Sequence, residues 1–163
     1  MRRISALSIA MSIAIGMTLT AATPASAQSR VNTVHIDVSV RIIDDETFRD
    51  EKGTRKYSDT VLVGPTDPRA VVEGEGCVGQ EVRVKTRFVI ELAPDRPAGT
   101  IRVYRFGRLY EGSSCSTNDL DGWVSLDYLY IGPNKTHTGS YRVRNEQEGG
   151  DKATVSYKIT NTL

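Results

Sequence analysis

The chain has 163 residues, of which 39% are hydrophobic and 25% charged, and its 21 Lys and Arg residues nearly balance its 20 Asp and Glu residues. This composition fits one ordinary globular domain and excludes a disordered tail or a collagen-like repeat. The formal net charge of +1 excludes a general electrostatic attraction to nucleic acid, so we expect no nucleic-acid partner.

The first 27 residues have the pattern of a cleaved signal peptide. Arg2 and Arg3 give a positive start, residues 4–20 are apolar and small, and Ala25-Ser26-Ala27 matches the motif of a signal-peptidase site. Five Ser and Thr residues interrupt the apolar run, which argues against a retained membrane anchor. We therefore expect residues 28–163 to form one secreted domain with no stable membrane span.

Alternation of apolar and polar residues with a period of two is the main structural signal in the remaining chain. Residues 33–43 place five apolar side chains on one face, namely Val34, Ile36, Val38, Val40 and Ile42. Residues 81–92 do the same with Val82, Val84, Phe88, Ile90 and Leu92. This pattern is typical of antiparallel strands with one side on a core. Between them we expect only short strands at 61–63 and 70–73, after a solvated loop of mixed charge at 44–56.

The second half of the chain contains four further predicted strands. Residues 100–110 begin with Ile101 and Val103 inward, and the pattern then slips at Phe106-Gly107, where we expect a β-bulge. In residues 123–131 one face is expected to point inward, and it consists of Val124, Leu126, Tyr128 and Tyr130. Residues 140–145 and 153–160 complete the set.

Turn-forming residues separate these strands at 64–68, 94–99, 132–134 and 148–151. Short strands at this spacing predict an all-β, single-domain antiparallel β-sandwich, immunoglobulin-like or jelly-roll-like, with a small β-barrel as the alternative. Cys77 and Cys115 are the two cysteines of the chain. Because an exported protein meets an oxidising compartment, we expect them to form a disulfide bond.

Aromatic and basic residues mark the predicted contact surface. Six of the eleven aromatic residues fall between positions 104 and 130. They could form a platform for sugar rings or a protein interface, or they could belong to the core. The expected ligand contacts are Tyr104, Phe106, Tyr110 and Trp123. A basic stripe could add a positive patch unless Glu81 and Glu91 pair with it; it comprises Arg83, Lys85 and Arg87, with Arg102, Arg105 and Arg108 from the next strand.

The segment 116–122 is the most motif-like part of the chain. Asp119 and Asp121, together with Glu111, could supply oxygen ligands to calcium in a β-loop. The alternative is an exposed turn, because Asn, Asp and Gly are common turn formers. Calcium is the only cofactor that the sequence suggests.

No catalytic constellation is recognisable in the sequence. His35 lies beside Asp37 on a polar strand face, and His137 lies in a Thr-rich loop; neither has a nucleophile motif or a zinc-ligand spacing. We therefore predict a secreted, non-catalytic binding module that contacts an extracellular polysaccharide or protein through residues 107–122 or through an aromatic and basic sheet face. Two alternatives stay open: a small secreted enzyme inhibitor that presents the disulfide-tethered loop near Cys115, and a hydrolase with an unrecognised site.

Overall fold

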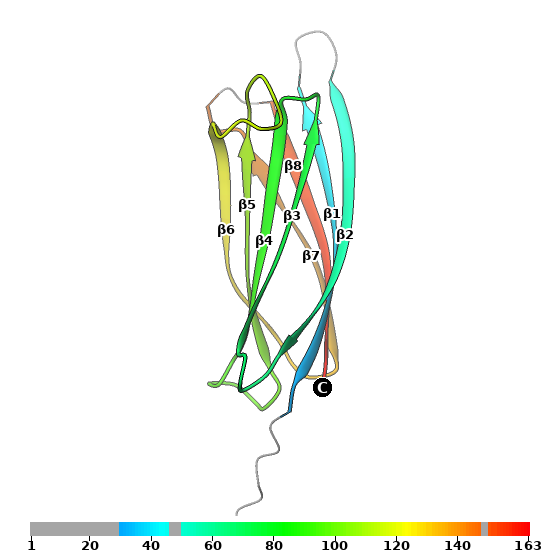
Figure 1. Cartoon of the computed structure of the whole chain (residues 1–163), viewed down its shortest axis with the longest axis vertical. Coiled ribbons are helices and arrows are strands. Elements are labelled where there is room, and N and C mark those ends of the chain that lie inside the picture. The colour runs from blue at the N-terminus through cyan, green and yellow to red at the C-terminus, as the bar shows by residue number, and fades with distance from the viewer. Residues whose placement is uncertain (1–29, 46–49, 148–149) are drawn as a thin grey trace, which may run out of the picture.

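The computed structural model describes residues 30–45, 50–147 and 150–163, and the signal peptide predicted for residues 1–27 lies outside this part. The described chain forms eight antiparallel strands, and the predicted all-β class is confirmed (Figure 1). They are β1 (Asn32–Asp44), β2 (Glu51–Val63), β3 (Arg69–Val78), β4 (Val82–Leu92), β5 (Ile101–Tyr110), β6 (Leu120–Ile131), β7 (Lys135–Arg144) and β8 (Lys152–Thr162). A membrane-crossing helix is absent from the described residues.

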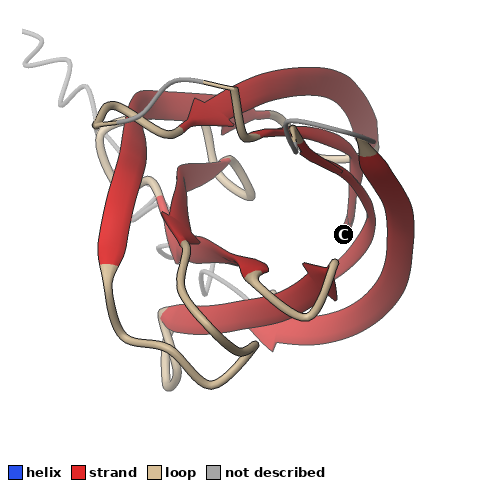
Figure 2. Cartoon of the chain, turned by 90° about the horizontal axis from the view of Figure 1, so that it is seen from above, coloured by secondary structure: helices blue, strands red, loops and turns tan. Residues whose placement is uncertain are grey.

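The strands form two four-stranded sheets that face each other. One sheet has the order β2-β1-β8-β7 and the other β3-β4-β5-β6, and the view from above shows them curving around a common interior (Figure 2). Within the described residues no ladder joins β2 to β3 or β6 to β7, so the molecule is a sandwich and the alternative of a closed barrel does not apply. Sheet neighbours are consecutive in the chain except for β1 and β8, which makes the order a meander rather than a Greek key.

The interior is built from the apolar faces that the period-two pattern predicted. The five inward side chains of β1, from Val34 to Ile42, are at most 3% exposed. On β4 the predicted inward residues Val82, Val84, Phe88 and Ile90 are fully buried, and Leu92 packs against them half-buried. Because each such side chain stabilises the fold by about 1.5–3 kcal/mol when it is fully buried, these central strands supply much of the stability.

The largest differences from the predicted strand starts occur in β2 and β7, which both lie at sheet edges. β2 starts at Glu51, inside the predicted loop, and β7 starts at Lys135, so His137 lies in a strand rather than in a loop. Only part of the inner face of an edge strand covers the core, because the opposite sheet does not extend over the rest. Arg55 and Asp59 pair with inward-facing residues of β1 and nevertheless remain exposed to solvent. The apolar alternation is therefore missing from β2. Charged residues at such positions also discourage pairing with another chain.

β5 keeps one alternation along its whole length, and the predicted slip at Phe106-Gly107 is wrong. Its fully buried apolar residues are Ile101, Val103 and Leu109. Arg105 and Gly107 continue the same inward positions, although neither is apolar. A side chain at Gly107 would collide with Val143 of β7, which explains why this inward position is a glycine.

The irregularities of this ladder lie in β6 instead, opposite the intervals Val103/Arg105 and Leu109/Tyr110, and the first of them changes which side chains of β6 face the core. Val103 pairs with Leu129 but Arg105 pairs with Leu126, so β6 has one more residue than β5 in this interval. This bulge reverses the alternation, because Leu126 points to the core before it and Leu129 after it. Two residues predicted to point inward are therefore on the outside, Tyr128 and Tyr130, which are 46% and 39% exposed.

The inward Arg105 holds the bulge in place. Its Nη2 donates to the carbonyl oxygen of Asp127 at 2.6 Å, and its Nη1 donates to the hydroxyl of Tyr157 at 2.6 Å. Asp127 lies in the interval where the β5–β6 ladder is interrupted, so its carbonyl group needs another partner. Arg105, which the sequence placed with the basic stripe, is thus part of the scaffold.

Two buried asparagines close the end of the sandwich that holds the C-terminus (Figure 1). Asn32 and Asn161 are both 0% exposed, and Nδ2 of Asn32 donates to Oδ1 of Asn161 at 2.7 Å. Both amides also donate to the carbonyl oxygen of Gly99, and Asn161 donates to those of Ile131 and Gly132. The pair ties the first and last strands to the loops before β5 and after β6.

Candidate functional site

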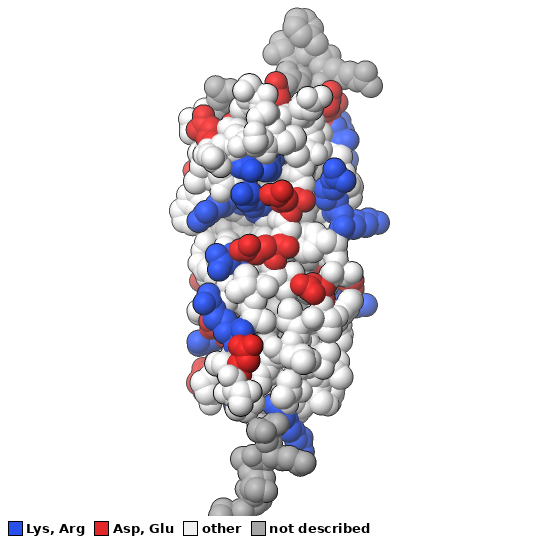
Figure 3. All heavy atoms as spheres, in the orientation of Figure 1, with Lys and Arg blue, Asp and Glu red and all other residues white. Residues whose placement is uncertain are grey.

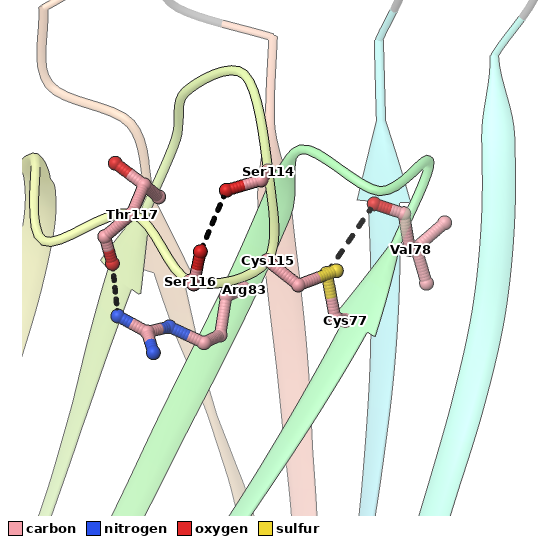
Figure 4. Close-up of a disulfide and its surroundings, with 7 residues drawn as sticks. All are labelled: Cys77, Val78, Arg83, Ser114, Cys115, Ser116 and Thr117. Carbon is pink, nitrogen blue, oxygen red and sulfur yellow. Dashed lines mark hydrogen bonds between the residues drawn. A yellow bond between two sulfur atoms is a disulfide. The ribbon is translucent and has the colours of Figure 1, made fainter.

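The predicted disulfide between Cys77 and Cys115 is present, with the two Cα atoms 5.9 Å apart. Cys77 lies near the end of β3, and Cys115 lies in the loop between β5 and β6 (Figure 4). Structural disulfides persist mainly in oxidising compartments, so the bond is consistent with an extracellular location.

Hydrogen bonds hold the same loop, residues 111–119, at further points. Arg83 of β4 donates to the carbonyl oxygen of Thr117 (Figure 4). The Thr117 hydroxyl donates to the carbonyl oxygen of Glu111 at 3.2 Å, and the Glu111 amide donates to the Asp121 carboxylate at 2.8 Å. The disulfide and these hydrogen bonds therefore fix the loop at one end of the β3–β6 sheet.

The acidic residues considered for calcium have other contacts. Asp121 accepts a hydrogen bond from the backbone of Glu111, and the Glu111 carboxylate accepts one from the Asn145 amide. Asp119 is exposed in the loop. Among the described residues no three Asp, Glu, His or Cys side chains come together in a way that could hold a metal ion. Calcium binding by Glu111, Asp119 and Asp121 stays a prediction.

The outward side chains of β3, β4, β5 and β6 form a surface that we call the outer face. Strand register aligns them in rows across the sheet. One row consists of Glu73, Arg87, Phe106 and Ser125, and the next of Glu75, Lys85, Arg108 and Trp123. The four predicted ligand contacts and the basic stripe without Arg105 therefore share this face. Figure 3 presents the face to the viewer, with basic and acidic side chains interspersed along it.

Aromatic rings cover the β5–β6 half of the outer face. Tyr104 lies 5.2 Å from Phe106 and 5.5 Å from Tyr128, measured between ring centroids. Trp123 is 61% exposed and lies well outside the core. Tyr110 is only 8% exposed, because the cationic groups of Arg83 and Lys85 lie over its ring. The outer face thus offers large apolar surface to solvent, which in a soluble domain often marks a contact site.

Most cations of the outer face already have partners within the sheet. Arg87 pairs with Glu73 at 3.1 Å, and Arg102 pairs with Glu91 at 2.9 Å. The hydrogen bond to Glu91 also raises the pKa of Arg102. The predicted pairing of Glu91 with the stripe is thus confirmed. Lys85 and Arg108 differ, since no carboxylate of the described residues lies within ion-pair distance of either.

Two adjoining hollows cross the outer face. One of about 480 Å³ lies over β3, β4 and β5, and another of about 360 Å³ lies over β5 and β6. Phe106 and Arg108 border both of them. Lys85 lines the first hollow, while Trp123 and Tyr104 line the second. The two hollows together form an uneven surface that runs across the strands and has room for an extended ligand.

The opposite sheet carries a hydroxyl–imidazole–carboxylate chain that the sequence did not reveal in full. His35 Nδ1 lies 2.9 Å from the hydroxyl of Thr60, and its Nε2 lies 3.2 Å from the carboxylate of Asp37. The order of groups resembles a catalytic triad. However, His35 pairs with Thr60 on one side and Thr160 on the other, so the neighbouring backbone N–H groups serve the sheet and are not free to stabilise an oxyanion. His35 and Thr60 are also exposed on an open face, and Asp37 is partly exposed beside them.

A third hollow, of about 470 Å³, lies beside this chain over β2, β1 and β8. Its outward lining is made mostly of serines and lysines, including Ser39, Ser156 and Lys158. It lacks the exposed rings of the outer face and is the weaker binding surface of the two.

No protein-family model matches the chain, and no curated protein shows significant similarity to it. The case for function therefore depends on the surface itself. Sequence reasoning found the aromatic and basic residues of the outer face but did not find Tyr128 and Tyr130 there. The bulge in β6 turns these two side chains outward, and the period-two pattern of the sequence does not reveal it.

Proposed function

We propose that the protein is an exported, non-catalytic binding module whose contact surface is the outer face. The observation that carries this proposal is the exposure of Trp123, Tyr128 and Tyr130 on one strand. They lie beside the partly covered rings of Tyr104 and Phe106. Aromatic rings contribute large contact areas at a low entropic cost, so a sheet face rich in them favours binding of a sugar polymer or a protein.

Export is part of the same proposal. The signal-peptide pattern of residues 1–27 and the disulfide both support it. The disulfide and the bond from Arg83 to Thr117 also hold the loop of residues 111–119 against one end of the outer face. This support pre-organises the surface, which lowers the entropic cost of binding.

The inhibitor alternative has less support from the geometry of the loop. The backbone amide of Thr117 donates to the carbonyl oxygen of Ser114 at 3.0 Å, which folds the segment around Cys115 into a turn. Peptide segments that dock by adding a strand to a partner's sheet need an extended backbone. The outer face therefore accounts better for binding than the loop alone does.

Replacement of Trp123 by alanine tests the proposal. Leu62→Ala is the matched control, because Leu62 is a large apolar residue with 60% exposure on β2, against 61% for Trp123. The experiment measures retention of the mature protein on insoluble polysaccharides such as cellulose, chitin and pectate. An aromatic anchor contributes about 2 kcal/mol or more, so Trp123→Ala should weaken binding about thirtyfold or more. Equal retention of both variants would refute the outer face as the contact surface.

A further inference from the structure

One row of the outer face offers charged side chains that form no ion pair among the described residues. Glu75, Lys85, Arg108 and Trp123 stand directly opposite one another on four successive strands. All four side chains are exposed. The row therefore presents an acid, two cations and an indole ring, in this order, from β3 to β6.

In the two neighbouring rows, the cations of β4 already have partners within the protein. In one of them Arg87 is bound to Glu73 and lies over the ring of Phe106, with its guanidinium carbon 5.6 Å from the centroid. In the other, Arg83 is bound to the carbonyl oxygen of Thr117. A cation with an internal partner must give up or share that contact to bind an external anion. Neither Lys85 nor Arg108 has a carboxylate within ion-pair distance among the described residues, although Lys85 lies over the ring of Tyr110, 5.6 Å from its centroid. A ligand anion can therefore bind at these two residues, and at Arg108 above all, without displacing an ion pair.

We infer that this row binds a chain of acidic sugars, with a sugar carboxylate on Arg108 and the neighbouring ring stacked on Trp123. The inference rests on the proposed function and names its ligand class. Arginine presents a planar fork of N–H donors that matches a carboxylate in two parallel hydrogen bonds. Trp123 presents the flat apolar surface that the C–H face of a sugar ring requires. A ligand that carries both groups in one unit is a uronic acid.

The hollows on both sides of Arg108 fit an extended chain rather than a single sugar. Arg108 borders the hollow over β3–β5 and the hollow over β5–β6. Three strand spacings of about 4.8 Å give the row a length of about 14 Å, enough for several successive units. Lys85, on the strand next to Arg108, meets the next carboxylate. Glu75 then ends the cationic segment on β3 and repels any carboxylate placed farther along.

The matched probes are polygalacturonate and its fully methyl-esterified form, which differ in charge and share one backbone. Binding of the mature protein is measured by isothermal titration calorimetry and affinity electrophoresis at low and high salt. The variants are Arg108→Gln and Trp123→Ala. Arg142→Gln is the control, because Arg142 is an exposed arginine on β7 of the other sheet and no carboxylate of the described residues lies within ion-pair distance of it. Thermal melting confirms that each variant is folded.

The expected result is binding of polygalacturonate that Arg108→Gln weakens about ten- to a hundredfold, as for loss of a charged hydrogen-bonding group. Trp123→Ala should weaken it as well, Arg142→Gln should leave it unchanged, and salt should reduce it by screening. Equal binding of the methyl ester would overturn the acidic ligand and leave the proposed binding module intact. Polyglutamate bound as tightly, with no effect of Trp123→Ala, would overturn the inference in favour of an acidic protein partner. Self-association lost with Trp123→Ala would assign the row to a second copy of the chain and overturn it as well.

Discussion

Removal of the disulfide tests how the binding surface is stabilised. The double variant Cys77→Ala and Cys115→Ala removes the covalent bond between the end of β3 and the β5–β6 loop. The other contacts of the loop remain, including the bond from Arg83 to Thr117 and the bond from the Glu111 amide to Asp121. We therefore expect the folded structure to persist and the unfolded chain to gain freedom.

The expected loss of stability depends on the length of the loop that the disulfide closes. The two cysteines are 38 positions apart, and closing a loop of this length stabilises the native state by about 4 kcal/mol in the chain-entropy treatment. With a urea m value of about 2 kcal/mol per molar, typical of a small domain, the midpoint of unfolding should fall by about 2 M. The m value should rise slightly, because an unfolded chain without the crosslink exposes more surface.

The assay is urea unfolding of the mature protein, followed by circular dichroism of the strands and by Trp123 fluorescence. Reduction of the natural disulfide with dithiothreitol should reproduce the effect of the double variant. Ser116→Ala is the control next to Cys115, since it removes only the exposed hydroxyl contact with Ser114 and should change stability by less than about 0.5 kcal/mol. An unchanged midpoint for the double variant would show that loop closure by the disulfide does not stabilise this fold.

Two further predictions concern the core. Asn161→Ala should destabilise the protein by about 2–4 kcal/mol in chemical unfolding, because it leaves the carbonyl groups of Ile131 and Gly132 without this donor. The control Thr162→Ala, at the exposed neighbour of Asn161, should cost less than about 0.5 kcal/mol, and similar losses for both variants would contradict this prediction. Burial raises the pKa of Tyr57 to about 12 and raises the pKa of Tyr141 as well. The folded state therefore keeps protons that the unfolded state releases above pH 10, so stability should be full below that pH and fall as the pH rises toward 12. Tyr57→Phe should make the alkaline loss shallower, and identical pH profiles would exclude this origin.

The faces of the central strands were predictable because their residues follow the core directly. β1 and β4 each pack against both neighbouring strands and the opposite sheet, so most of their inward side chains are apolar, with Thr86 of β4 a buried exception. Val34 or Phe88 could therefore be assigned from alternation alone. The disulfide was predictable for a different reason, since Cys77 and Cys115 are the two cysteines of a chain whose first 27 residues have the pattern of a signal peptide. These predictions needed no knowledge of which strands pair.

The edge strands and the bulge were not predictable in this way. β2 lies at a sheet edge, where Arg55 and Asp59 can occupy inward positions without entering the core. The bulge in β6 depends on Arg105, whose donor group satisfies the carbonyl of Asp127 from the neighbouring strand. Both features follow from pairing between distant segments, which a local pattern of residues does not encode.

From the sequence alone one can derive the class of fold, the inner faces of the central strands, the crosslink and the clustering of six of the eleven aromatic residues between positions 104 and 130. The outward direction of Tyr128 and Tyr130 is a result of the three-dimensional fold. The same holds for the cations of the outer face, since Arg87 and Arg102 have a carboxylate partner while Lys85 and Arg108 have none among the described residues. The physical reason is that a side chain's neighbours across a sheet depend on strand order and register. A single shift of one residue in β6 changes which rings meet solvent, and with it the surface on which a ligand can bind.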